Sequence, residues 1–109
     1  MSVITFRTGS DKFLNTVNTY LDELAILLQT EPNIMLSVEV HVYDMPMKSE
    51  NLKLSKDRVN NIVRYLTEKG VSQKCIKASG QGSTNPLIDI NDPANPIKKN
   101  RVEMSLFYK

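Results

Sequence analysis

The sequence has little of several residue types on which metal, redox and catalytic sites depend. Its 109 residues include one cysteine, Cys75, one histidine, His41, and no tryptophan. A single cysteine excludes an internal disulfide framework and argues against a structural zinc site, and a single histidine excludes metal sites built from two histidines. We therefore expect neither a bound metal nor a cofactor.

Charge and long hydrophobic runs are equally sparse. The 14 basic and 12 acidic residues leave a net charge of +2, a smaller excess than a domain relying on phosphate contacts usually carries. No apolar run approaches the roughly 20 residues of a membrane helix, and no signal peptide opens the chain. We therefore expect one small domain with one core and no nucleic-acid partner.

Turn residues and hydrophobic periods divide the chain into six elements. Helical periods predict helices at residues 11–30, with an apolar stripe that begins at Leu14, and from 51 or 54 to 69, ending before Gly70. Alternation and turn signals predict four strands, at residues 3–7, 34–43, 75–79 and 101–108. The order β-α-β-α-β-β predicts an α/β (α+β) two-layer sandwich, in which both helices cover one face of a mixed four-stranded sheet.

Motifs of nucleotide-binding and hydrolytic enzymes are absent from the sequence. Gly80-Gln81-Gly82 follows an expected strand, but no helical pattern comes after it, so we interpret these residues as a turn. A thiol nucleophile formed by Cys75 with His41 is one alternative, and a buried apolar role for Cys75 in a short strand is the favoured one. The sequence therefore predicts a protein that is not an enzyme.

Arg58 is the charged residue whose position is most informative. It lies beside the apolar stripe of the second predicted helix, close to the expected start of that helix. A guanidinium group there is well placed to bind a carboxylate through two hydrogen bonds, and the backbone amides of the helix start add to an anion site. The alternative is a solvated arginine, or one paired with Asp44 or Glu50.

The segment around Arg58 resembles a known family. Residues 51–66 are similar to the N-x-x-L-S-x-x-R-A-x-x-V-x-x-x-L motif of OmpA-like domains, the peptidoglycan-binding modules of Gram-negative envelope proteins, peptidoglycan-associated lipoproteins and flagellar stator proteins. Shorter matches follow the family order along the whole chain, at Ile4-Thr5-Phe6, Val38 to His41, Lys69-Gly70-Val71, Gly80 to Pro86 and Asn100 to Glu103.

This resemblance implies a single OmpA-like domain at residues 1–109, excised from a larger envelope protein and located in the periplasm. It implies non-catalytic binding of peptidoglycan, with other envelope proteins as further partners. In the family, an aspartate after the second strand and an arginine in the second helix hold the charged groups of a diaminopimelate stem peptide. The arginine corresponds to Arg58 and the family asparagine to Asn51, while Arg101 lies in the match to the N-R-R-V-E strand.

The position of the aspartate leaves two alternatives. The family spacing of fifteen residues leads back from Arg58 to Tyr43, and Asp44 follows one residue later. Asp44 takes the role of the family aspartate if the strand ends before it or if a bulge turns its side chain toward Arg58. Otherwise Tyr43 occupies the site, and the domain is a degenerate member that acts in protein interaction or as a scaffold. The apolar loop 45–47 fits either a protein contact or packing over the sheet edge.

Overall fold

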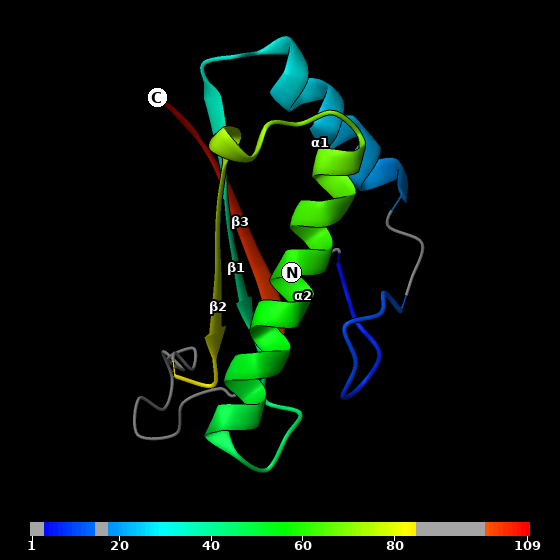
Figure 1. Cartoon of the computed structure of the whole chain (residues 1–109), viewed down its shortest axis with the longest axis vertical. Helices are drawn as coiled ribbons and strands as arrows, with labels where there is room; N and C mark the ends of the chain where they lie inside the picture. Colours follow the sequence, from blue (N-terminus) through cyan, green and yellow to red (C-terminus); the bar gives the residue numbers. More distant parts are fainter. Residues whose placement is uncertain (1–3, 15–17, 85–99) are drawn as a thin grey trace, which may run out of the picture.

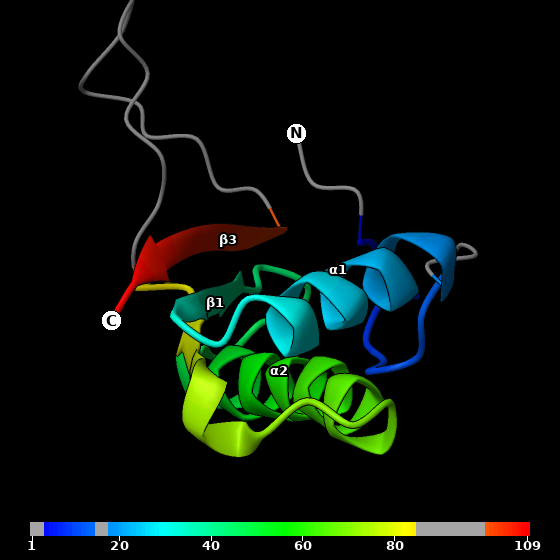
Figure 2. The same ribbon diagram turned by 90° about the horizontal axis from the view of Figure 1, so that it is seen from above.

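The structure is a computed structural model that describes residues 4–14, 18–84 and 100–109 (Figure 1). Figure 2 shows both helices on the same side of the sheet, so the predicted two-layer α+β sandwich is confirmed. The elements, in chain order, are α1 (Asn18–Thr30), β1 (Ile34–His41), α2 (Lys48–Glu68), the short 3-10 helix η1 (Gln73–Cys75), β2 (Ile76–Gly82) and β3 (Arg101–Tyr108).

The sheet is mixed, as predicted, with β1 in its centre. Strand β1 pairs in parallel with β2 and antiparallel with β3, so that Val38 lies between Ala78 and Met104. The described residues form three strands, and the expected fourth strand at residues 3–7 is wrong for the part of it that the structure describes.

The N-terminal segment turns back on itself instead of forming that strand. The Leu14 amide donates to the Thr5 carbonyl at 2.9 Å, and the rings of Phe6 and Phe13 stack 5.1 Å apart. The expected helix start at residue 11 is therefore also wrong, and the Ser10 hydroxyl accepts from the Lys12 amide within this turn. Leu14, predicted in the apolar stripe, is 64% exposed.

The core lies between β1 and the helices. Alternate residues of β1 face it, which explains the strict hydrophobic alternation of this strand. Ile4 from the N-terminal segment also reaches the core. The buried apolar residues are Ile4, Leu21, Leu24, Ala25, Leu28, Leu36, Val38, Val40, Val42, Val59, Ile62, Leu66 and Val71.

The C-terminal end of α2 forms as the sequence indicates. Gly70 adopts φ +103°, which L side chains rarely adopt, and its amide donates to the Thr67 carbonyl. The Val71 amide donates to the Leu66 carbonyl at 3.1 Å, which completes a Schellman motif, and the Val71 side chain is buried. This cap directs the chain from α2 back toward the sheet.

The segment after α2 differs from the prediction in two places. Cys75 ends η1 instead of opening a strand, and its side chain is half-buried against the core. Strand β2 continues through residues 80–82, which the sequence alone indicated as a turn. Residues 85–99, between the expected strands at 75–79 and 101–108, lie outside the described residues. Neither α1 nor α2 is long and apolar enough to cross a bilayer.

Candidate functional site

The N-terminal half of α2 carries a buried polar stripe. Asn51, Ser55 and Arg58 are 4%, 0% and 2% exposed, and they follow one another at helical spacing. Because α2 begins at Lys48, Arg58 lies in its third turn and inside the buried face. The prediction of a helix beginning at residue 51 or 54, with Arg58 near its start, is therefore wrong.

Arg58 forms an ion pair with Asp44. Its Nη2 atom lies 2.8 Å from Asp44 Oδ2, and the two side chains are 3% and 10% exposed. The Arg58 Nε–H group donates to the Ser10 carbonyl at 2.7 Å, and Nη2 also donates to the Arg7 carbonyl at 3.0 Å. The guanidinium group lies 5.0 Å from the centre of the Phe6 ring. These contacts fix the orientation of the positive charge.

The Asp44 carboxylate accepts hydrogen bonds from three separate parts of the chain. The Gly9 amide donates to Oδ2 at 3.1 Å, Arg58 donates to the same atom, and the Asn100 amide group donates to Oδ1. Burial by itself raises the pKa of Asp44. The hydrogen bonds from Asn100, Gly9 and Arg58, together with the charge of Arg58, outweigh burial and hold this pKa below its ordinary value. Asp44 is therefore ionised at neutral pH.

The end of β1 explains why Asp44, one residue later than the family spacing, faces Arg58. Strand β1 ends at His41, three residues before Asp44. The pairing with β2 also shifts at this point, because Val40 is opposite Gly80 whereas His41 is opposite Gly82. Asp44 is therefore free of the alternation of the strand.

Two glycines of β2 let the sheet approach α2 closely beside this ion pair. A Cβ atom on Gly80 would lie 2.6 Å from the Lys56 nitrogen, and one on Gly82 would lie 2.9 Å from the Leu52 Cα atom. The Gly82 amide donates to the Ser55 hydroxyl at 2.9 Å. No side chain fits between the two backbones, so β2 and α2 form a rigid support for the site.

Asn51 and Tyr43 shape the loop that connects β1 to α2. The Asn51 side chain accepts from the Met45 amide at 2.9 Å and donates to the Met45 carbonyl at 3.1 Å. The Tyr43 amide donates to the Asn100 side chain at 2.5 Å. Asn51 and Tyr43 also line a cavity of about 670 Å³ together with Met45, Pro46 and Thr84. Both residues thus lie beside the Asp44–Arg58 pair without taking the place of either member.

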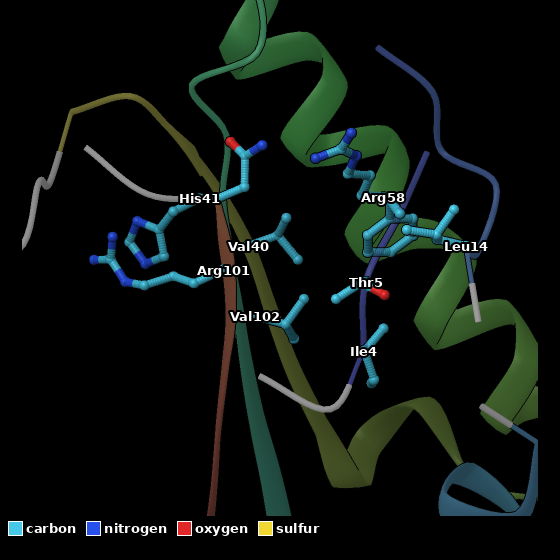
Figure 3. A pocket seen from close by; sticks show the side chains of 10 residues that line it. Ile4, Thr5, Leu14, Val40, His41, Arg58, Arg101 and Val102 are labelled. Atoms are coloured by element: carbon cyan, nitrogen blue, oxygen red, sulfur yellow. The ribbon is translucent and has the colours of Figure 1, made fainter. Parts of the chain in front are cut away.

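Arg101 lies on the other side of the sheet from Arg58. Figure 3 shows the Arg101 and His41 side chains pointing away from Arg58, across the strands that carry Val40 and Val102. The Arg101 Nε–H group donates to the Glu103 carboxylate. A cavity of about 240 Å³ extends along this part of the molecule, and its lining includes both arginines. The structure therefore brings Asp44 and Arg58 together and separates Arg101 from them.

Sequence reasoning missed several contacts of the ion pair. Asn100 supplies a side-chain donor to Asp44 from a position 56 residues away, and Phe6 lies against the Arg58 guanidinium group. The Arg7 and Ser10 carbonyl groups accept from Arg58 through the backbone, and no residue type signals such acceptors. The short matches near Phe6 and Asn100 were the only signals in the sequence that these segments belong to the site.

Comparisons with known proteins agree with this fold. The model of the OmpA family matches residues 5–101. The sequence is 33% identical over 103 residues to the uncharacterized protein YtxE of Bacillus subtilis, and 27% identical over 100 residues to motility protein B of Helicobacter pylori. These alignments cover 90% and 87% of this chain. The chain spans only 42% and 39% of the length of these two relatives.

Solved structures show the same architecture. The C-terminal domain of Helicobacter pylori MotB has a TM-score of 0.73 at 23% identity, with 97% of this chain and 83% of that chain covered. The peptidoglycan-associated lipoprotein of Burkholderia pseudomallei has a TM-score of 0.77 at 22% identity, with 97% and 88% covered. Because the family model covers most of the sequence and these folds agree with it, the chain belongs to the OmpA family.

Proposed function

We propose that this domain anchors an envelope protein to peptidoglycan by binding the diaminopimelate of the stem peptide, on the periplasmic side of the envelope. The observation that carries the proposal is the buried Asp44–Arg58 pair, with its 2.8 Å separation. Arg58 corresponds to the family arginine, and Asp44 lies one residue after the position of the family aspartate. The side chain of diaminopimelate ends in an ammonium and a carboxylate group, so a site for it needs one fixed charge of each sign.

The contacts of Arg58 support a division of roles between the two charges. Hydrogen bonds to Ser10, Arg7 and Asp44 use three of its N–H groups, all on Nε and Nη2. Among the described residues, Nη1 makes no hydrogen bond, and Arg58 lines the cavity of about 240 Å³. A ligand carboxylate accepts from Nη1 in this proposal, and the ligand ammonium group donates to Asp44. Binding of this kind requires no reaction step.

Titration of the domain with a diaminopimelate-containing muropeptide, followed by amide NMR, tests the proposal. We expect saturable shifts at residues 7–10, 44 and 100, which surround the ion pair. Asp44→Asn and Arg58→Gln should each weaken binding by about tenfold or more, since each removes one charge from a charge-assisted contact. Asp57→Asn is the matched control, because Asp57 is paired with Lys53 on the exposed face of the same helix. Absence of shifts in the folded protein would contradict the proposal.

A second candidate is a scaffold function in which the domain contacts other envelope proteins. One observation favours it: Arg58 already donates to two carbonyl groups of its own chain, as a purely structural arginine does. Met47 is 60% exposed in the loop beside the site and offers an adaptable apolar contact. If the muropeptide causes no shifts while Met47→Ser disrupts association with a partner protein, the scaffold function is the correct one.

A further inference from the structure

Four charged or titratable side chains meet on the sheet face that the helices do not cover. In the antiparallel pairing of β1 with β3, Glu39 is opposite Glu103 and His41 is opposite Arg101. Cross-strand partners project from the same face of a sheet. Leu36, Val38 and Val40 of β1 point into the core, so Glu39 and His41, which alternate with them, point to the opposite face. The side chains of His41 and Arg101 in this group point away from Arg58 (Figure 3).

His41 is buried in this group without a hydrogen bond. Its side chain is 2% exposed, and among the described residues neither ring nitrogen has a hydrogen-bond partner. Buried polar atoms without partners are rare in folded proteins and call for an explanation. The Nε2 atom faces both carboxylates, at 3.6 Å from Glu39 Oε2 and 3.7 Å from Glu103 Oε2. These distances are too long for hydrogen bonds.

The same distances fit two ligand atoms bound to one metal ion. Zinc bonds to nitrogen and oxygen of about 2.0–2.2 Å, at tetrahedral angles, place neighbouring ligand atoms about 3.3–3.6 Å apart. All three ligand atoms of Glu39, His41 and Glu103 lie within 4.8 Å of one another. The carboxylate side chains are 44% and 48% exposed, so an ion reaches them directly from solvent.

The charges around His41 favour a cation. Glu39 and Glu103 contribute two negative charges and Arg101 contributes one positive charge, which leaves one net negative charge beside the ring. A divalent cation beside the ring would be attracted by this net charge.

We propose that Glu39, His41 and Glu103 form a binding site for a divalent transition-metal ion such as Zn²⁺. One imidazole and two carboxylates form a donor set that suits zinc and its first-row neighbours better than magnesium or calcium. The Glu103 Oε2 atom accepts a hydrogen bond from the Arg101 Nε–H group, so metal binding shifts this contact to the other carboxylate oxygen or weakens it. The ion would link β1 to β3 on the open face of the sheet.

The experiment uses the untagged chain, stripped with a chelator, and titrates it with Zn²⁺ while imidazole NMR signals are recorded. His41 is the sole histidine, so its signals need no assignment. We expect saturable shifts at a one-to-one ratio. Glu39→Gln and Glu103→Gln should each weaken binding by about tenfold or more. Glu23→Gln, which changes an exposed glutamate of α1, should leave the affinity unchanged.

Cys75→Ser in parallel removes the thiol as an alternative zinc ligand and should leave the imidazole shifts intact. Unchanged His41 signals at about 1 mM Zn²⁺, a concentration that detects even weak binding, would overturn the proposal. Equal affinity in Glu39→Gln, Glu103→Gln and Glu23→Gln would also overturn it. Muropeptide titrations of the same variants should match the unmodified chain, which separates this site from the peptidoglycan site.

Discussion

The two halves of α2 bury the same face of one helix with opposite chemistry. In the N-terminal half the buried residues are Asn51, Ser55 and Arg58, whereas in the C-terminal half they are mainly apolar, at Val59, Ile62 and Leu66. The apolar half belongs to the same core as residues of β1 and α1, and its packing depends only on the shape of the side chains and the area that they bury. The polar half instead contacts specific backbone and side-chain atoms of three other segments, namely the N-terminal segment, the loop after β1 and strand β2. The apolar half therefore stabilises the core, and the polar half holds the residues of the site in place.

The largest effect should come from removing the cation of the polar half. Arg58→Met leaves the Asp44 carboxylate, at 10% exposure, without its ion pair, and breaking such a buried pair costs about 3–5 kcal/mol. Urea unfolding at neutral pH measures the loss. Arg64→Met is the control, because Arg64 is exposed on the same helix and, within the described part of the chain, donates to the Asn61 side chain alone. Equal losses in both variants would show that the pair adds no stability.

Truncation in the apolar half should cost nearly as much but leave recognition intact. Leu66 is fully buried, so Leu66→Ala removes packing and leaves a cavity that costs about 3 kcal/mol. Ile26→Ala, at a side chain that is 63% exposed, should cost less than about 1 kcal/mol. Under conditions where Leu66→Ala is folded, its muropeptide affinity should equal that of the unmodified domain. A large loss of affinity would contradict the division between the two halves.

Ser55→Ala tests the polar half without changing any charge. The substitution leaves the Gly82 amide, which donates to Ser55 at 2.9 Å, buried without an acceptor, and this costs about 1–3 kcal/mol. The unfolding free energy of Ser49→Ala, at an exposed position in the first turn of α2, should change by less than about 0.5 kcal/mol. If both variants are equally stable, the contact between β2 and α2 does not depend on this hydrogen bond.

Acidic pH should reduce the stabilisation that the Asp44–Arg58 pair gives to the folded state. The pKa of Asp44 is lower in the folded than in the unfolded chain, so the unfolded state binds the proton more tightly. The stabilisation from Asp44 is complete above its unfolded pKa of about 3.9 and is lost as the pH falls through the folded value.

Urea unfolding at several acidic pH values measures this dependence. Asp44→Asn should flatten the slope, because it removes the carboxylate whose pKa is lowered in the folded chain. Glu103, whose pKa is lowered by the hydrogen bond from Arg101, supplies part of the slope that remains. An unchanged slope in Asp44→Asn would contradict the assigned ionisation of Asp44.

The smallest effect is expected at the solvent-exposed pair on the same helix. Lys53 and Asp57 lie 3.3 Å apart, but their side chains are 81% and 43% exposed. Water and salt screen such a pair, so Asp57→Asn should cost about 0.3–0.5 kcal/mol, and less at high ionic strength. A loss comparable to that of Arg58→Met would remove the contrast between buried and exposed pairs.

Local signals predicted the C-terminal half of α2 well. Gly70 followed by Val71 indicated the cap, and the apolar period indicated the buried stripe, because both depend on residues a few positions apart. The N-terminal segment shows where such signals fail. Leu14 continues the helical period of α1, yet the pairing of Phe6 with Phe13 turns this segment back on itself and leaves Leu14 exposed.

The candidate site was predictable only in part, for a similar reason. Arg58 stands in a long local motif and was identified from it. Whether Asp44 faces Arg58 depends on where β1 ends and on the register shift opposite Gly80 and Gly82, which are properties of the assembled sheet. The contact from Asn100 depends on a chain reversal over more than fifty residues, and no local pattern encodes it.

The most direct test of the peptidoglycan site compares two muropeptides that differ by one carboxylate group, one with diaminopimelate and one with lysine in its place. Calorimetric titration gives the affinity of each for the unmodified domain and for Arg58→Gln. We expect about tenfold or greater preference for diaminopimelate in the unmodified domain and no preference in Arg58→Gln, because Arg58 binds the extra carboxylate in the proposed site. Equal affinities in the unmodified domain, or a preference that survives Arg58→Gln, would contradict it.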